Sequence, residues 1–433
     1  GLYSSNGTLT CEDLPASLGN ERLDAKTIAS WGCEFFKYDF CHHNRISGDC
    51  PAIEHIVITK PKSAFEIDLR PEDAEFTGRA KIIKMSDVPS KKAIGFISHG
   101  SGSASFNFDA DEKGEYVLTF VFHKSMAKKK QYMQIHINGK MYEIFFPETK
   151  GFSPLGRQQI IVELKEGTNN MTIKNPVATA IDSSYIQYKR MGNALKEASS
   201  MWAKVTHSEE KPITYSICEW GMARPYLWGA KAGSMWRTTP DIAPNWRSIT
   251  MIYNRTLKLY KHSGPGHWND PDMLEVGNGK LDDNENRAHF SLWCMLAAPL
   301  MLGNDIRSFV SNGMPDKDNE TLKIVTNKHM IAVDQDSLGK SAKRIKKESG
   351  IDIIARPLSN GDVALCLFNT ASSTKSVNFK LDDLTKDPYL GIEEAPSGYE
   401  LHDLWTDERT TGTTINATIP KHSTVVYRVK PTI

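Results

Sequence analysis

Residues 35–41 read Phe-Phe-Lys-Tyr-Asp-Phe-Cys, an apolar run that ends in a Lys-x-Asp pair and a cysteine. This pattern predicts a buried parallel strand that carries the cation of Lys37 and the carboxylate of Asp39 to its C-terminal edge. Barrels built from such strands do their chemistry at that edge. A strand that simply ends in a solvated or capping aspartate explains the same stretch equally well, so the rest of the chain must decide.

The composition favours a water-exposed protein with an uncharged partner. The chain has 433 residues, enough for two or three domains, and a formal net charge of +1 from 53 basic and 52 acidic residues. This balance gives no electrostatic reason to expect nucleic acid or an anionic membrane as a partner. The longest apolar run, residues 290–302, contains Pro299 and is too short to span a bilayer.

The chain begins Gly-Leu-Tyr-Ser-Ser, without an initiator methionine, a basic segment or an apolar signal core. We therefore expect the numbering to open inside a domain, with an N-terminal part missing or present as a separate segment or chain. The seven cysteines form no CxxC metal pattern. Cys11 and Cys41 end successive strand-like segments and could form a disulfide, which favours an extracytoplasmic location (secreted, periplasmic or lysosomal).

Helical and strand-like patterns alternate in two separate parts of the chain. Residues 23–31 have helical spacing and residues 33–39 follow as a strand. The same rhythm returns with a helix over 191–205, a strand over 214–218 and an amphipathic helix over 246–260. Repeated strand–helix units build parallel sheets. We therefore predict one barrel, formed by 1–50 and 189–330, with an insertion between two of its strands.

The intervening residues 53–188 show short alternating strands instead, and none of the nine tryptophans falls among them. Asn138-Gly139 between two of these strands is a strong hairpin signal. We predict an antiparallel β-sandwich for this segment. Alternating strands also dominate residues 331–433, which predicts a C-terminal antiparallel β domain.

Four acidic residues lie where strands of the predicted barrel end. They are Asp39, Glu219, Asp241 and Asp272, and aromatic residues neighbour them at Tyr3, Tyr38, Trp220, Trp236 and Trp268. Glycoside hydrolysis requires two carboxylates in one cleft, and aromatic faces suit the C–H groups of sugars. The alternative is four ordinary loop acids that cap helices.

The motifs at these strand ends resemble glycoside hydrolase family 27, which contains the α-galactosidases and α-N-acetylgalactosaminidases. The resemblance covers residues 1–45 and 189–433 approximately. For the fold, it implies a (β/α)8 TIM barrel, whose first strands are absent from this chain, and a C-terminal antiparallel β-sandwich. For the function, it implies retaining hydrolysis of α-galactoside-containing glycans, with no cofactor required for catalysis. The motifs are Gly1-Leu2-Tyr3, Lys37-Tyr38-Asp39, Cys218-Glu219-Trp220-Gly221, Trp236-Arg237-Thr238-Thr239-Pro240-Asp241 and Trp268-Asn269-Asp270-Pro271-Asp272-Met273.

The same resemblance assigns roles to individual residues. It implies that Asp39 is the nucleophile, Asp241 the acid/base, and Cys11–Cys41 a disulfide at the barrel rim. The substrate-binding residues that it implies are Tyr3, Lys37, Cys218, Glu219, Trp220, Arg237, Asp272 and Met273.

Physical arguments set separate requirements for the two catalytic carboxyls. Lys37 lies on the same strand face as Asp39 and should favour the ionised carboxylate that a nucleophile needs. Asp241 should hold its proton through burial or a neighbouring negative charge. In a retaining glycosidase, the two carboxyls should stand about 5 to 5.5 Å apart.

Glu219 bears on the choice of sugar. The resemblance places small residues at this position in the N-acetylgalactosaminidases, so the acidic side chain favours galactose with a free 2-hydroxyl. The related β-L-arabinopyranosidases remain an alternative, because the residues that distinguish them belong to barrel strands that this chain lacks. A non-catalytic sugar-binding fragment is the rival from a different functional class.

The inserted segment resembles a family 35 carbohydrate-binding module. The resemblance rests on residues 114–120, 137–140 and 181–186. It implies a structural Ca²⁺ held by Asp73, Glu75 and Asp182, although solvated surface acids explain these residues at least as well. Glycan binding and a purely structural role for the insert are equally supported by the sequence.

Overall fold

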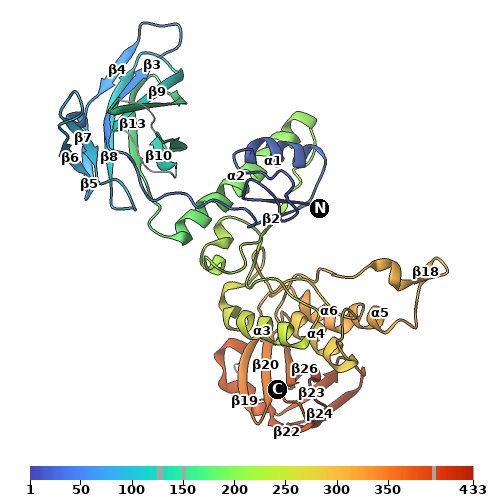
Figure 1. Ribbon diagram of the computed structural model, residues 1–433. Helices are drawn as coiled ribbons and strands as arrows, with labels where there is room; N and C mark the ends of the chain where they lie inside the picture. Colours follow the sequence, from blue (N-terminus) through green and yellow to red (C-terminus); the bar gives the residue numbers. More distant parts are fainter. Residues whose placement is uncertain (124–129, 149–152, 393–395, 433) are drawn as a thin grey trace. The chain divides into compact units, whose positions relative to one another are not determined.

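The computed structural model describes residues 1–123, 130–148, 153–392 and 396–432 (Figure 1). These residues divide into two compact units, one formed by Gly1–His43 with Tyr188–Ile433 and the other by Asn44–Gln187. The further boundary predicted near residue 331 stays a prediction. Among the described helices, none is both long enough and apolar enough to cross a membrane.

The first unit contains a five-stranded parallel sheet. Its strands lie side by side in the order β1 (Leu2–Ser5), β2 (Phe35–Asp39), β14 (Thr214–Ile217), β15 (Met235–Arg237) and β16 (Trp268–Asp270). All neighbouring pairs are parallel. The helices that alternate with these strands are α1 (Glu21–Ser30), α2 (Ala180–Thr206), α3 (Trp246–Thr256) and α4 (Asp283–Met295). The predicted strand–helix alternation is confirmed except between β14 and β15, which are joined by the 3-10 helices η2 (Pro225–Leu227) and η3 (Gly229–Lys231).

Strand β2 shows why the sheet presents Lys37 and Asp39 together. Successive side chains of a strand point to opposite faces. Phe36 and Tyr38 are fully buried, and the Tyr38 ring packs edge-on against Tyr188 of α2 at a centroid distance of 5.7 Å. Lys37 and Asp39 therefore share the opposite face, as the sequence predicted.

Helix α2 corrects one sequence-based prediction. Residues 181–186 were expected to close the β-sandwich, but they lie in the first turns of α2. Thr179 and Asp182 explain this start: the Asp182 carboxylate accepts the Thr179 backbone N–H at 2.8 Å, and the Thr179 hydroxyl lies 3.4 Å from the Asp182 backbone nitrogen. This reciprocal arrangement is a capping box, which satisfies backbone N–H groups at a helix N-terminus.

The second unit is the predicted β-sandwich. One sheet has the order β11 (Lys140–Phe146), β10 (Gln131–Ile137), β13 (Gly167–Lys174), β8 (Gly102–Ala110) and β5 (Glu75–Gly78). The other has the order β12 (Leu155–Leu164), β9 (Gly114–His123), β3 (Ile53–Thr59), β7 (Lys92–Gly95) and β6 (Lys81–Lys84), with β4 (Glu66–Leu69) paired to β3. The predicted hairpin joins β10 to β11, with φ of 49° at Asn138 and 85° at Gly139.

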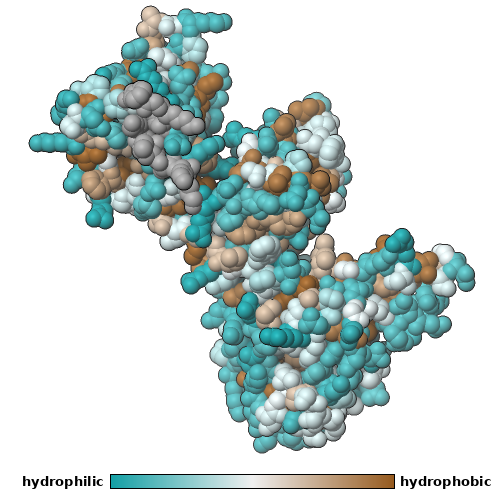
Figure 2. Space-filling view, in the orientation of Figure 1, coloured by the Kyte–Doolittle hydropathy of each residue, from teal (hydrophilic) through white to brown (hydrophobic). Residues whose placement is uncertain are grey.

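The first unit also contains the C-terminal antiparallel strands. A six-stranded sheet has the order β19 (Lys343–Glu348), β20 (Ile351–Pro357), β21 (Val363–Asn369), β26 (Thr424–Thr432), β23 (Gly398–Asp403) and β24 (Arg409–Gly412), and β22 (Lys375–Lys380) pairs with β25 (Thr414–Ile419). Figure 2 shows mainly hydrophilic residues on the visible face of this region.

The C-terminal sheet is covered on both faces. Ile354 and Phe368 belong to the core that includes α3 and α4, whereas Ile353 and Leu365 belong to the core that includes β22 and β25. This explains why β20 and β21 are buried along their whole length. The strands begin later than predicted: helix α6 (Lys328–Asp334) occupies the start of the expected β domain.

Candidate active site

The C-terminal ends of the five parallel strands meet at one edge of the sheet. The register pairs Ser5 with Asp39 and Arg237 with Asp270. Glu219 follows β14 by two residues. Because these strands run in the same direction, their last residues share that edge. The structure thus brings together acidic residues that are far apart in the sequence.

Asp39 has positive or partially positive neighbours. Its side chain is 8% exposed and its Oδ2 lies 3.9 Å from Lys37 Nζ. The Phe40 backbone N–H donates to Asp39 Oδ1 at 2.8 Å. Lys37 Nζ also lies 5.9 Å from the centre of the Tyr3 ring. Burial, followed by the negative charge of Asp39, raises the pKa of Tyr3, so its phenol stays neutral.

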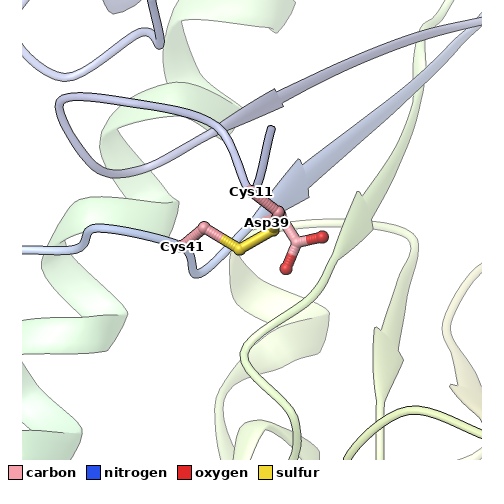
Figure 3. Close-up of side chains that lie close together, drawn as sticks. All are labelled: Cys11, Asp39 and Cys41. Carbon is pink, nitrogen blue, oxygen red and sulfur yellow. A yellow bond between two sulfur atoms is a disulfide. The ribbon is translucent and has the colours of Figure 1, made fainter. Parts of the chain in front are cut away.

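The predicted Cys11–Cys41 disulfide is present beside Asp39 (Figure 3). The two sulfur atoms and an Asp39 carboxylate oxygen lie within 4.8 Å of one another. Tyr3 donates its hydroxyl hydrogen to Cys11 Sγ at 3.0 Å. Since both sulfurs are bonded to each other, this cluster offers no thiolate for a metal ion.

Reduction of this disulfide should destabilise the first unit. The bond closes a loop with a sequence separation of 30, for which the loss of chain entropy in the unfolded state corresponds to about 3 to 4 kcal/mol. Urea denaturation of Cys11→Ala/Cys41→Ala against the oxidised protein measures this difference. Cys33→Ala removes a thiol that forms no disulfide and serves as the control. An unchanged unfolding midpoint in the double variant would contradict the prediction.

Residues 218–220 continue from β14 into the site. The Tyr188 hydroxyl lies 3.2 Å from the Asp39 carbonyl oxygen and 3.1 Å from that of Cys218, which connects the ends of β2 and β14. Burial raises the pKa of the Cys218 thiol, and the Asp39 carboxylate acts in the same direction. Trp220 has a positive φ of 59°, and its ring packs edge-on against Phe40 at 5.9 Å.

Glu219 is fully buried. Its Oε2 accepts the Ala223 backbone N–H at 2.6 Å, whereas its buried Oε1 has no hydrogen-bond partner in the described residues. Burial raises the pKa of Glu219 to about 8. A carboxyl with this pKa is mostly protonated at neutral pH and can donate as well as accept a hydrogen bond.

This pKa predicts a pH dependence of stability. In the unfolded chain Glu219 ionises above its ordinary pKa near 4.5, whereas the folded protein keeps the proton up to about pH 8. The contribution to stability is therefore complete at low pH and is lost as the pH rises from about 4.5 to 8. Glu219→Gln should reduce the stability difference between pH 5 and pH 8 by about 3 kcal/mol.

Urea denaturation at the two pH values tests this expectation. Glu209→Gln changes an exposed glutamate and should behave like the parent protein. The same pH dependence in the parent and in Glu219→Gln would show that this carboxyl is not held protonated.

Arg237 connects several of the predicted site residues. Its side chain is 1% exposed, and its Nη2 lies 2.5 Å from Asp272 Oδ2 and 3.0 Å from Asp241 Oδ1. Its Nη1 donates to Cys218 Sγ at 3.6 Å. The contacts therefore run from the Cys218 thiol through Arg237 to Asp272 and Asp241.

The environment predicted for Asp241 is not observed. Its side chain is 69% exposed and contacts the Arg237 guanidinium, a cation, rather than a second carboxylate. The physical reason is its position four residues beyond Arg237, the last residue of β15, in a segment outside the strand. The role of Asp241 as acid/base stays a prediction.

The end of β16 adds Asp270, a residue for which the sequence predicted no role. Asp272 has a φ of 87°, and its Oδ2 accepts the Ile242 backbone N–H at 2.8 Å. Asp270 accepts the Asp272 backbone N–H at 2.8 Å, and burial raises the pKa of Asp270. Its position as the last residue of a strand was the available signal. Met273, the next residue in the sequence after Asp272, is 41% exposed.

Two family models match the parts of the chain that flank the insert. The model described as α-galactosidase A matches residues 1–55 and 178–336, and the one described as the α-galactosidase C-terminal β-sandwich domain matches residues 348–429. The chain belongs to the α-galactosidase family. This is glycoside hydrolase family 27, as the strand-end motifs implied.

The chain aligns with only part of the length of individual α-galactosidases. It is 36% identical over 253 residues to the α-galactosidase of Cyamopsis tetragonoloba, covering 57% of this chain and 58% of that protein. It is 41% identical over 186 residues to that of Oryza sativa subsp. japonica, covering 43% and 40%. The chain thus spans about half the length of the curated relatives it matches.

Solved α-galactosidase structures share the fold. α-Galactosidase I of Mortierella vinacea superposes with a TM-score of 0.60 at 22% identity, covering 99% of this chain and 76% of that chain. The α-galactosidase of Saccharomyces cerevisiae gives 0.58 at 20% identity, covering 99% and 79%. These likenesses support the α/β barrel architecture with a C-terminal β-sandwich.

Residues 56–177, which make up most of the second unit, fall in the gap of the α-galactosidase A match. The Ca²⁺ ligands predicted for the insert are not brought together: within the described residues, Asp73, Glu75 and Asp182 form no common cluster of ligand atoms. Asp182 instead caps α2, and Asp73 accepts the Arg70 backbone N–H at 2.7 Å. The resemblance of the insert to a carbohydrate-binding module stays a prediction.

Proposed function

We propose that the chain carries the active site of a retaining exo-α-galactosidase, which hydrolyses terminal α-linked galactose. Three buried polar atoms at the strand ends support a sugar pocket: Glu219 Oε1, Trp220 Nε1 and Arg237 Nε have no partner in the described part of the protein. Buried polar groups are normally hydrogen-bonded. The hydroxyl groups of a sugar both donate and accept hydrogen bonds and would satisfy such atoms.

In the proposed reaction, Asp39 attacks the anomeric carbon while Asp241 transfers a proton to the leaving oxygen. The bond between the anomeric carbon and that oxygen breaks, and galactose becomes bonded to Asp39. Asp241 then takes a proton from water, whose oxygen attacks the anomeric carbon and releases Asp39. Before the first step, Arg237 must break its ion pair with Asp241 while it keeps its ion pair with Asp272.

The remaining residues would hold the sugar. Lys37 and Tyr3 lie next to Asp39 and would bind hydroxyls and line the pocket. Glu219 and Arg237 would meet the 2-hydroxyl, and the bulk and polarity of Glu219 would exclude an acetamido group. The Cys218 thiol, Trp220, Asp272 and Met273 would form the rest of the wall.

The substrates proposed are α-galactosyl oligosaccharides. The Saccharomyces cerevisiae α-galactosidase has been solved with raffinose, which makes raffinose a suitable natural substrate to test here. No cofactor takes part in the proposed reaction. An oxidising, extracytoplasmic compartment suits the Cys11–Cys41 disulfide.

The stereochemistry of the first product tests this proposal. Proton NMR during hydrolysis of an aryl α-galactoside should show α-galactose before mutarotation, because two inversions at the anomeric carbon restore its configuration. The aryl α-N-acetylgalactosaminide is the matched substrate that should be hydrolysed far more slowly. Initial release of β-galactose would reject the proposal. So would the absence of hydrolysis of both the aryl α-galactoside and raffinose.

A further inference from the structure

A second cluster of ionisable side chains lies in the C-terminal part of the first unit. It consists of His329 at the start of α6, His402 on β23 and Asp407 in the turn before β24. One ring nitrogen of each histidine and one Asp407 oxygen lie within 4.8 Å of one another. Asp407 Oδ1 lies 2.5 Å from His402 Nε2 and 3.4 Å from His329 Nε2.

We propose that His329, His402 and Asp407 form a binding site for a divalent transition-metal ion such as Zn²⁺. Two imidazole nitrogens and a carboxylate oxygen are preferred ligands of this class of ion. The two rings stand nearly perpendicular, at 84°, with centroids 4.8 Å apart, so that both nitrogens converge on the same oxygen. Small shifts of the side chains would open the space for an ion between them.

The Asn327 side chain helps to hold the segments that carry these ligands in place before any ion binds. Asn327 Oδ1 accepts the His329 backbone N–H at 3.0 Å, and Asn327 Nδ2 donates to the Leu404 carbonyl at 3.1 Å. One side chain thus joins the start of α6 to the turn after β23. A site with ligands on two fixed elements loses little conformational entropy when the ion binds.

The turn that carries Asp407 is also fixed. The Asp403 carboxylate accepts the backbone N–H groups of Trp405 and Thr406 at 2.8 and 3.0 Å, and the Asp407 backbone N–H donates to the Asp403 carbonyl at 3.0 Å. Asp407 has a φ of 64°, a conformation that costs energy for a residue other than glycine. Strained, over-determined residues of this kind are concentrated at ligand-binding positions.

Neighbouring charges limit the affinity of the cluster for a cation. Lys328 and Arg409 carry positive charges near His329 and oppose a cation, so we expect an affinity in the micromolar rather than the nanomolar range.

An open pocket gives access to the cluster. Its volume is about 640 Å³, and solvent in it can supply the remaining ligands of the ion. The two acidic residues that line this pocket already have cationic partners: Asp362 contacts Arg428 at 2.5 Å, and Glu400 contacts Lys430 at 3.1 Å. His329 and His402 line this pocket, and Asp407 contacts both of their rings, so an ion could reach the cluster from the pocket.

Isothermal titration of the whole chain with Zn²⁺ tests the site. We expect saturable binding of one ion, and an increase of Kd by at least about tenfold in His329→Ala and in Asp407→Asn. The side chains of both residues are partly exposed, so these variants should fold even if a His402 variant does not. Circular dichroism checks the fold of each variant.

Two controls separate this site from non-specific binding. His99 pairs with Asp49 at 2.8 Å on the other unit, and His99→Ala should leave the Kd unchanged because a single His–Asp pair supplies too few ligands. Alkylation of the partly exposed Cys33 and Cys50 should also have no effect. Absence of saturable Zn²⁺ binding, or binding unchanged in His329→Ala and Asp407→Asn, would overturn the proposal.

Discussion

Asp39→Ala should lower kcat for an aryl α-galactoside by at least about 10⁴-fold, because the variant cannot form the covalent intermediate. Azide should restore part of the activity by entering the space left by the carboxylate. It would attack the anomeric carbon from the Asp39 side, and the product should be β-galactosyl azide. Product NMR and initial rates measure both effects.

Asp241→Ala makes the complementary variant. Here azide would attack the galactosyl–Asp39 intermediate, so the product should be α-galactosyl azide. Asp305 is another exposed aspartate that pairs with an arginine, Arg307, and Asp305→Ala should retain full activity. Normal turnover by Asp39→Ala, or the same azide anomer from both variants, would contradict the assigned roles.

Arg237→Ala should reduce the stability of the protein by about 3 to 5 kcal/mol, as expected when one partner of a buried ion pair is removed. The Asp272 side chain, 8% exposed, would be left buried without its cation, and Asp270 would lose a nearby positive charge. The loss of the guanidinium should also abolish turnover. Urea denaturation followed by intrinsic fluorescence measures the stability.

A double variant distinguishes the ion pair from lost packing. Arg237→Ala/Asp272→Asn should recover about 1 to 3 kcal/mol relative to Arg237→Ala, because the buried charge is removed. Arg307→Ala removes an exposed arginine with an acidic partner and should hardly change stability. No recovery in the double variant would show that the Asp272 charge is not the cause.

Local patterns were sufficient to predict much of this fold. The alternation of residues 35–39 placed Lys37 and Asp39 on one face because side chains of a strand alternate. Asn138-Gly139 predicted its hairpin because both residues accept a positive φ. The Cys11–Cys41 disulfide, which the strand pattern allowed and the family resemblance implied, joins the segments that follow two adjacent parallel strands.

Other features depended on contacts between distant residues. The exposure of Asp241 and its pairing with Arg237 follow from the path of the chain after β15, which no local pattern specifies. The raised pKa of Asp270 requires neighbours from several strands. The start of α2 is different, because the Thr179–Asp182 capping box is a local signal; it competes with the resemblance of the same segment to the end of a carbohydrate-binding module.

The proposed reaction depends on a covalent bond between Asp39 and galactose. A fluorinated galactosyl substrate with a good leaving group slows the second step of a retaining reaction and lets the intermediate accumulate. Peptide mass spectrometry after incubation should locate one added fluorosugar on Asp39. Hydrolysis that proceeds without any label, or a label on another residue, would contradict the role of Asp39 as nucleophile.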